Sequence, residues 1–324
     1  MTRGESSEPD ARREASAFTL DDFGSDDAAM RKCLDLARLA ARTDLPLLIV
    51  GESGTGKTLL ARAIHNSSRR ARGPFVSFNT AALSDTLLDS QLFGHEKGAF
   101  TGAERTVRGK FELAHGGTLF LDEIGDMSPT AQAKALRAIE YGEFEKLGSE
   151  ALERADVRVI SATHWPIETF VASEQFRKDL FYRISGITLA IPPLRERPED
   201  LRSLIASEIA LASRKEGKTV TGLDRAAVDL LLAHPWPGNL RELSRVIHTA
   251  VALSPGDIIL PDTIVLAPLA SRPSTTSPAD GDLRLRTMER RHIREVLARL
   301  GGNKRRAARA LGLSRSTLDR KLGA

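Results

Sequence analysis

An eight-residue run has the composition and spacing of a phosphate-binding loop. It consists of Gly51, Glu52, Ser53, Gly54, Thr55, Gly56, Lys57 and Thr58. Glycines in this pattern let backbone N–H groups face phosphate oxygens, and the lysine supplies positive charge for the β- and γ-phosphates. The hydroxyl of Thr58 stands where a Mg²⁺ ligand is needed. Because an apolar run precedes it and a helical pattern follows it, the run predicts a nucleoside triphosphate site. The alternative is a chance match in a glycine-rich turn.

Two adjacent carboxylates, Asp122 and Glu123, end the apolar run that begins at Gly117. A buried strand end is a costly place for two charges unless they bind a cation or a substrate. Asp122 fits the role of a Mg²⁺ ligand, and Glu123 fits that of the carboxylate that polarises the attacking water. The alternative is an acidic pair at the start of a helix over 127–139, and pairing with the phosphate-binding loop favours the catalytic interpretation.

A third segment, residues 94–103, surrounds one aromatic residue, Phe100, with small residues. Its glycines predict a mobile, exposed loop with Phe100 at the tip. An exposed phenylalanine is unfavourable in water unless it meets a partner. The alternative is a buried turn with Phe100 in the core.

These segments require a scaffold, and the hydrophobic pattern predicts one of alternating strands and helices. The order indicates a parallel α/β sheet. The predicted strands cover 46–50, 74–79, 117–122, 156–163 and 186–191. The predicted helices cover 27–43, 57–65, 83–93 and 130–139.

After Pro198 the patterns typical of strands stop, and only helical patterns follow. Helical patterns over 201–215, 224–233 and 239–253 predict a small all-helical domain. A segment rich in Pro, Ser and Thr follows and predicts a flexible linker. The predicted organisation is a polar segment (1–19), an α/β domain (20–190), a helical domain (191–266), a linker (267–282) and a C-terminal helical domain (283–324).

Composition excludes several classes of protein. The chain has 324 residues, of which 41% are hydrophobic and 28% charged, as in ordinary globular proteins. No apolar run approaches the ~20 residues that span a bilayer, and the polar N-terminus lacks the apolar core of a secretory signal. The single cysteine, Cys33, excludes a disulfide framework and a cysteine zinc site. A cytoplasmic protein is expected.

The C-terminal segment is strongly basic and has a two-helix pattern. Residues 283–324 hold 13 Lys/Arg against 3 Asp/Glu, whereas the rest of the chain is mildly acidic. Helices over 304–311 and 315–322, with Ser314 as the N-cap of the second, predict a helix-turn-helix that binds DNA. A basic oligomerisation hairpin or a solvated helix surface is the alternative. The residues expected to face DNA are Arg315, Ser316, Thr317, Arg320 and Lys321.

Six segments in order resemble the AAA+ domain of bacterial enhancer-binding proteins, the sigma-54-dependent transcriptional activators. They are GESGTGKT, GAFTGA, GGTLFLDEIGD, FRKDLFYR, PPLRER and WPGNLRE, and the resemblance covers residues 20–265. The segment GGNKRRAARALGLSRSTLDRKL resembles a Fis-type helix-turn-helix. The resemblance implies an α/β AAA+ P-loop NTPase with a parallel sheet, a small α-helical lid and a C-terminal all-α helix-turn-helix.

The resemblance also implies roles for single residues. Asn79 would hold Glu123 in a nucleotide-dependent switch. Arg177 and Arg183 would be arginine fingers that reach the nucleotide of a neighbouring subunit, and Arg241 would touch the nucleotide from the lid. His164 stands where the family more usually has asparagine as sensor I, so its role there is an open question. The loop that would contact sigma-54 comprises Gly98, Ala99, Phe100, Thr101, Gly102 and Ala103.

The function implied by the resemblance is activation of transcription. The protein would bind enhancer DNA, assemble into a ring, expected to be hexameric, and hydrolyse ATP with Mg²⁺. It would use that energy to convert the closed complex of sigma-54 RNA polymerase into the open complex. The N-terminal segment is short for a sensing domain, so control in trans by an inhibitor or co-regulator is expected. Two alternatives stay open: a DNA-binding AAA+ regulator that does not act through sigma-54, and a remodeller of a different protein.

Overall fold

A computed structural model of the chain describes residues 18–81, 84–266, 293, 297, 303–311, 313, 314, 317 and 318. The chain divides into two compact units, Met1–Leu266 and Ala267–Ala324. Most of the predicted polar segment 1–19 and the whole predicted linker 267–282 lie outside the described residues. The domain boundaries given above therefore stay predictions.

The first unit is built on a five-stranded sheet in which every pairing is parallel. The spatial order is β2-β5-β8-β1-β9, so β1 lies between β8 and β9, which are the last two strands of this sheet along the chain. All five strands lie within the ranges that the hydrophobic runs predict. They are β1 (Leu47–Val50), β2 (Phe75–Asn79), β5 (Thr118–Asp122), β8 (Arg158–Thr163) and β9 (Ile187–Ala190).

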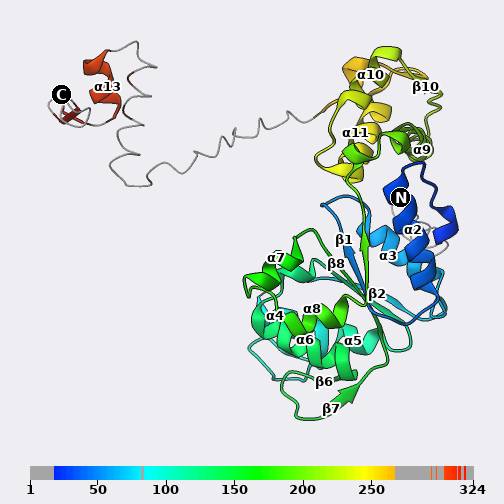
Figure 1. Cartoon of the computed structure of the whole chain (residues 1–324), viewed down its shortest axis with the longest axis vertical. Helices are drawn as coiled ribbons and strands as arrows, with labels where there is room; N and C mark the ends of the chain where they lie inside the picture. Colours follow the sequence, from blue (N-terminus) through cyan, green and yellow to red (C-terminus); the bar gives the residue numbers. More distant parts are fainter. Residues whose placement is uncertain are drawn as a thin grey trace, which may run out of the picture. The chain divides into compact units, whose positions relative to one another are not determined.

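Helices cover both faces of this sheet (Figure 1). Successive strand side chains point to opposite faces, so Leu47 and Ile49 pack in one apolar cluster and Leu48 in the other. The cluster that contains Ile49 is completed by α2 (Ala28–Ala41) and α3 (Lys57–Asn66). The opposite cluster is completed by α4 (Asp85–Phe93), α5 (Lys110–Leu113), α6 (Pro129–Tyr141), α7 (Ile167–Ala172) and α8 (Lys178–Ile184).

Short elements that the hydrophobic pattern does not predict connect the larger ones. Two antiparallel hairpins are formed by β3 (Gly94–His95) with β4 (Val107–Arg108), and by β6 (Glu143–Glu145) with β7 (Leu152–Arg154). Two single turns of 3₁₀ helix, η1 (Leu20–Asp22) and η2 (Ile124–Asp126), precede α2 and follow β5. Strands of two or three residues are too short for an alternating pattern to appear in the sequence.

The helical lid follows the sheet in the chain. Its helices are α9 (Pro198–Glu216), α10 (Arg225–Ala233) and α11 (Asn239–Leu253), and η3 (Leu194–Glu196) and η4 (Pro261–Thr263) flank them. The fully buried Trp236 lies in its apolar core and donates from Nε1 to the Leu231 carbonyl at 3.0 Å. The expectation that no strand follows Pro198 is wrong in one detail, because β10 (Gly222–Leu223) and β11 (Ile258–Ile259) pair in parallel.

The second unit contains α13 (Lys304–Ala310) and a small apolar cluster. Ala307, Ala308 and Leu318 are buried there, as expected for two short helices that pack together. The Ser314 hydroxyl accepts the N–H of Thr317 at 3.1 Å, which matches its predicted role as an N-cap. Of the residues expected to face DNA, Thr317 is described and partly buried. Arg315, Ser316, Arg320 and Lys321 lie outside the described residues.

No helix within the described ranges combines the length and apolar character needed to cross a membrane.

Candidate active site

The predicted site residues meet at the carboxyl edge of the central sheet. Because all strands run in the same direction, their carboxyl ends lie on one side. Val50 pairs with Thr163 across β1 and β8, and Asn79 pairs with Asp122 across β2 and β5. The phosphate-binding loop, the acidic pair and the residues after β8 therefore emerge side by side.

The phosphate-binding loop leads from β1 into α3, with Gly54 and Gly56 in positive-φ conformations (+80° and +99°). A side chain at Gly54 would clash with the carbonyl oxygen of Gly238 in the lid. Lys57 opens α3 and is buried, and its Nζ donates to the carbonyls of Gly51 (2.9 Å) and Glu52 (3.3 Å). The loop thus presents a cation and a helix N-terminus together, which is an arrangement that binds phosphate.

Thr58 and Asp122 bring two oxygen ligands together. The Thr58 hydroxyl donates to Asp122 Oδ2 at 3.5 Å. Burial, together with the negative charge of Glu123, raises the pKa of Asp122, so a cation here would relieve an unfavourable charge. Among the described residues no cluster of three or more His, Cys, Asp or Glu side chains could hold a metal by itself. The hydroxyl and carboxylate oxygens of Thr58 and Asp122 fit Mg²⁺, which is usually bound by one or two protein ligands together with phosphate oxygens and water.

Glu123 has a strained backbone conformation. Its carboxylate lies between His164 and Lys57. Its φ is +56°, in a region that residues other than glycine seldom occupy. Its Oε2 accepts hydrogen bonds from His164 Nδ1 (2.6 Å) and the His164 N–H (3.2 Å), and its Oε1 lies 3.6 Å from Lys57 Nζ. Burial alone would raise the pKa of Glu123, but the His164 hydrogen bond and the charge of Lys57 outweigh it and lower the pKa. The carboxylate is therefore ionised and able to accept a proton.

The side chain of Asn79, at the end of β2, is hydrogen-bonded locally in this structure. Its side-chain oxygen accepts the N–H of Ala81 at 2.8 Å, while the carboxylate of Glu123 is bound by His164. The nucleotide-dependent switch with Asn79 stays a prediction. His164 follows β8 directly and makes this contact with Glu123, and its role as sensor I stays a prediction.

The lid contacts the phosphate-binding loop through three residues. Arg195 donates from both terminal nitrogens to the Glu52 carboxylate at 2.6 and 2.8 Å, and this ion pair lowers the pKa of Glu52. Asn239, fully buried, donates to Glu52 Oε2 (3.2 Å) and to the Ser53 carbonyl (3.1 Å). Arg241 donates to the Ser53 hydroxyl at 2.9 Å, which places it beside the loop as the resemblance implies. Arg195 and Asn239 belong to the segments PPLRER and WPGNLRE, but no local signal in the sequence distinguishes them from their neighbours.

The two predicted arginine fingers belong to the FRKDLFYR segment around α8. The guanidinium group of Arg177 pairs with Asp179 at 2.7 Å. Arg183 donates to the Glu140 carbonyl at 3.0 Å. Neither bond is to the phosphate-binding loop or to Glu123, so a role for these arginines in a neighbouring subunit's site stays a prediction.

The loop 98–103 folds back on itself. The Gly98 N–H donates to the Ala103 carbonyl at 2.8 Å, and the Ala103 N–H donates to the Phe100 carbonyl at 3.0 Å. Phe100 is partly buried and packs edge-on against His95, with ring centres 5.0 Å apart. The expectation of an exposed Phe100 at the loop tip is therefore wrong for this structure. Phe100 is not in the core either, because its side chain is only partly buried, by contact with the His95 ring.

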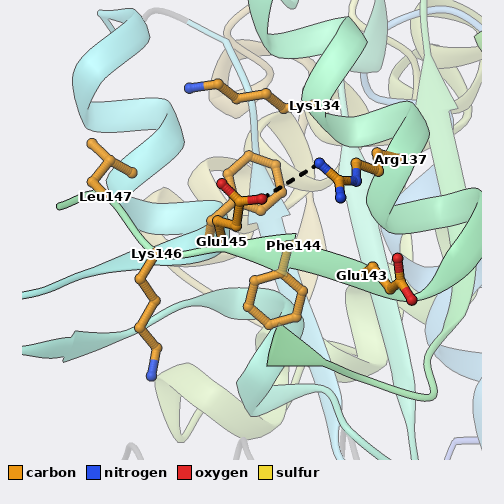
Figure 2. A pocket seen from close by; sticks show the side chains of 8 residues that line it. Lys134, Arg137, Glu143, Phe144, Glu145, Lys146 and Leu147 are labelled. Carbon is orange, nitrogen blue, oxygen red and sulfur yellow. Dashed lines mark hydrogen bonds and ion pairs between the residues drawn. The ribbon is translucent and has the colours of Figure 1, made fainter. Parts of the chain in front are cut away.

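The base of this loop is joined to the segment after β6. The Leu147 N–H donates to the Gly94 carbonyl (3.0 Å), and its own carbonyl accepts the Glu96 N–H (2.9 Å). A cavity of about 280 Å³ lies beside this junction, between α6 and β6. Figure 2 shows the side chains that line it. It is lined by Phe93, Lys134, Arg137, Glu143, Phe144, Glu145, Lys146 and Leu147.

Comparison with known protein families divides the chain into three matched segments. Residues 23–190 match the Sigma-54 interaction domain, and residues 195–280 match the AAA+ ATPase lid domain. Residues 284–324 match the family described as bacterial regulatory protein, Fis family.

Curated relatives and solved structures agree with these matches. The transcriptional regulatory protein ZraR of Klebsiella oxytoca is 46% identical over 92% of this chain. The hydrogenase transcriptional regulatory protein HoxA of Cupriavidus necator is 46% identical over 89%. The chain spans 67% and 62% of the lengths of these two relatives.

Crystal structures of NtrX from Brucella abortus are also similar. The complex of NtrX with ADP is 34% identical, with a TM-score of 0.71, over 97% of this chain and 71% of that one. The complex with ATP is 32% identical, with a TM-score of 0.69, over 97% of this chain and 72% of that one. Together with the fold and the residues at the sheet edge, these matches show that the chain belongs to the sigma-54-dependent transcriptional activators, with an AAA+ P-loop NTPase domain, a helical lid and a Fis-type helix-turn-helix.

Proposed function

We propose that this protein binds enhancer DNA through residues 283–324 and assembles into a ring, with six subunits as the expected number. In that ring it hydrolyses ATP with Mg²⁺ and converts the closed complex of sigma-54 RNA polymerase into the open complex. The observation that carries the proposal is the union of two features in one domain. Lys57, Asp122 and Glu123 meet at one sheet edge, and the domain that contains them matches the Sigma-54 interaction domain.

The chain's own residues divide the work of hydrolysis. Lys57 and the N-terminus of α3 bind and orient the phosphates, and Thr58 and Asp122 would hold Mg²⁺. When bound, Mg²⁺ would neutralise charge on the β- and γ-phosphates. Glu123 accepts a proton from the attacking water because its carboxylate is ionised and faces the same sheet edge.

The lid supplies a second set of contacts to the phosphate-binding loop. Arg195 and Asn239 hold Glu52, and Arg241 holds Ser53, so a change in the loop on binding or hydrolysis changes the contacts of the lid. A lid that moves with the nucleotide state is a means to pass the energy of hydrolysis to the rest of a ring.

Loop 98–103 is the part proposed to contact sigma-54. Gly98 and Gly102 have φ values of +85° and +100°, and a β-carbon at either position would meet no atom within 4 Å, so this backbone has room to rearrange. Phe100 would leave His95 and offer its ring to the partner. The proposal is tested by open-complex formation on a sigma-54 promoter with and without ATP. Activation that needs ATP supports it, and no activation with active ATPase favours a regulator that does not act through sigma-54.

We expect Arg177→Ala and Arg183→Ala each to reduce ATP turnover, because each would remove a positive charge from the site of a neighbouring subunit. Mixing either variant with Glu123→Ala subunits restores part of the activity, since some interfaces then contain an intact site. Arg202→Ala, which removes an exposed arginine of α9, serves as the matched control. A monomeric protein whose turnover per molecule does not change with concentration would contradict the proposed ring.

Deletion of residues 283–324 is expected to abolish enhancer binding and to leave ATP hydrolysis intact. The 13 Lys/Arg in this segment predict that binding is dominated by phosphate contacts. Affinity of the intact protein should then fall about 10³-fold or more between about 50 and 200 mM salt, as for a dimer with about six phosphate contacts. Fluorescence anisotropy with a labelled duplex measures both effects. Loss of ATPase activity on deletion would show instead that the segment is needed for assembly.

A further inference from the structure

His164, which binds the Glu123 carboxylate, is not itself well covered. One third of its side chain is exposed to solvent, whereas Glu123 is only 16% exposed. An exposed imidazole can rotate into water and lose the 2.6 Å contact unless another group fixes the plane of its ring. The residues around His164 show such a group.

Trp165 packs against the imidazole ring. The two ring centres are 4.4 Å apart, and the planes are tilted by 37°. Trp165 is itself held by two hydrogen bonds. Its indole Nε1 donates to Asp126 Oδ1 at 2.7 Å, and its backbone N–H donates to the Thr163 hydroxyl at 3.1 Å. The indole also packs against Phe170, with ring centres 5.2 Å apart.

The turn after β5 is shaped to admit this indole. A side chain at Gly125 would stand 2.9 Å from Trp165 Cδ1 and 3.0 Å from the Thr163 hydroxyl, so Gly125 leaves the space that the ring fills. The next residue, Asp126, is bound to Glu123 through its own N–H, which donates to the Glu123 carbonyl at 2.9 Å. Glu123, His164, Trp165 and Asp126 thus form a closed ring of contacts between the end of β5 and the end of β8.

We propose that Trp165 and Asp126 are positioning residues for ATP hydrolysis, which act by holding the His164 imidazole against the carboxylate of Glu123. This inference rests on the proposed role of Glu123 as the group that activates water. Neither Trp165 nor Asp126 touches the phosphate-binding loop in the contacts described above. Their effect passes through His164, and a fixed carboxylate keeps the attacking water in line.

The test measures steady-state ATP hydrolysis by the full-length protein and the affinity for a fluorescent ATP analogue. We expect Trp165→Ala to lower kcat about tenfold, because a misplaced general base loses much of its effect. The KM for ATP and the analogue affinity should change less than about twofold, since Lys57 and Thr58 are untouched. A general loss of folded protein would instead lower the amount of active enzyme and the melting temperature.

Three matched variants separate the hydrogen bond from the packing. Asp126→Ala removes the acceptor of the indole N–H and should lower kcat about threefold, whereas Asp126→Asn keeps an acceptor oxygen and should stay near the wild-type rate. Trp165→Phe keeps an aromatic ring on His164 but removes the N–H, so it should match Asp126→Ala. If Trp165→Ala does not fold, wild-type rates for both Trp165→Phe and Asp126→Ala overturn the proposal.

A double-mutant cycle shows whether Trp165 acts through His164. His164→Ala should lower kcat, and adding Trp165→Ala to it should cause no further loss. Independent, multiplicative losses in the double variant would overturn the proposal, because Trp165 would then act by another route. Failure of the proposed function is recognised separately: if Glu123→Gln hydrolyses ATP at the wild-type rate, the assignment of the base is wrong whatever Trp165 does.

Discussion

Replacement of Glu123 by glutamine is expected to lower the rate of ATP hydrolysis about a hundredfold or more while ATP remains bound. Glutamine has nearly the same shape, and its amide oxygen can still accept the hydrogen bonds from His164. It cannot accept a proton from water, so the chemical step alone is affected. The two effects are measured by steady-state phosphate release and by binding of a fluorescent ATP analogue.

Two further variants make this result specific. Lys57→Ala should weaken binding of the analogue itself, because it removes the buried cation that would face the phosphates. Glu216→Gln, which neutralises an exposed carboxylate at the end of α9, should leave both measurements unchanged. Retention of wild-type hydrolysis by the Glu123 variant would remove the carboxylate from the mechanism and require another group to activate water.

Replacement of Phe100 by alanine is expected to abolish open-complex formation and stable capture of sigma-54 in the presence of a transition-state analogue of ATP. DNA binding, assembly and ATP hydrolysis should stay largely intact, since Phe100 lies outside the site formed by Lys57, Asp122 and Glu123. The ring packs on His95 at the loop surface, so its removal should cost stability no more than about 1 kcal/mol.

The control for this prediction is Leu39→Ala, which removes an exposed apolar side chain on α2. Both variants are compared in promoter opening, in capture of sigma-54 and in thermal melting. Wild-type activation by Phe100→Ala would contradict the proposed role of loop 98–103, and a DNA-binding regulator independent of sigma-54 would then be the better interpretation.

Local signals in the sequence were sufficient to predict the strands of the sheet and the longer helices. Short β-rich apolar runs located all five strands of the sheet, and helical spacing located α2, α3, α6 and the three lid helices to within a few residues. These signals are strong because a strand buried on both faces reads as a nearly continuous apolar run, and a helix buried on one face carries apolar residues at a helical period. The hairpins β3–β4 and β6–β7 are too short to give either signal, so only the folded chain reveals them.

The phosphate-binding loop and the Asp122–Glu123 pair could also be identified from the sequence, because each consists of contiguous residues with a characteristic spacing. The packing of Phe100 could not be predicted, since a single apolar side chain among glycines is equally consistent with an exposed tip and a buried turn. The structure shows neither, because the His95 ring covers Phe100 only in part.

The reactive groups and the order of the elements that carry them could therefore be predicted from the amino-acid sequence. The contacts between those groups depend on the folded chain. Glu123 meets His164 and Asp126 meets Trp165 because β5 and β8 are neighbours in the sheet. Glu52 meets Arg195 and Asn239 because the lid packs on the phosphate-binding loop. The physical reason is that strand order and lid placement depend on packing between distant segments, whereas hydrophobic period and motif spacing report only on neighbours along the chain.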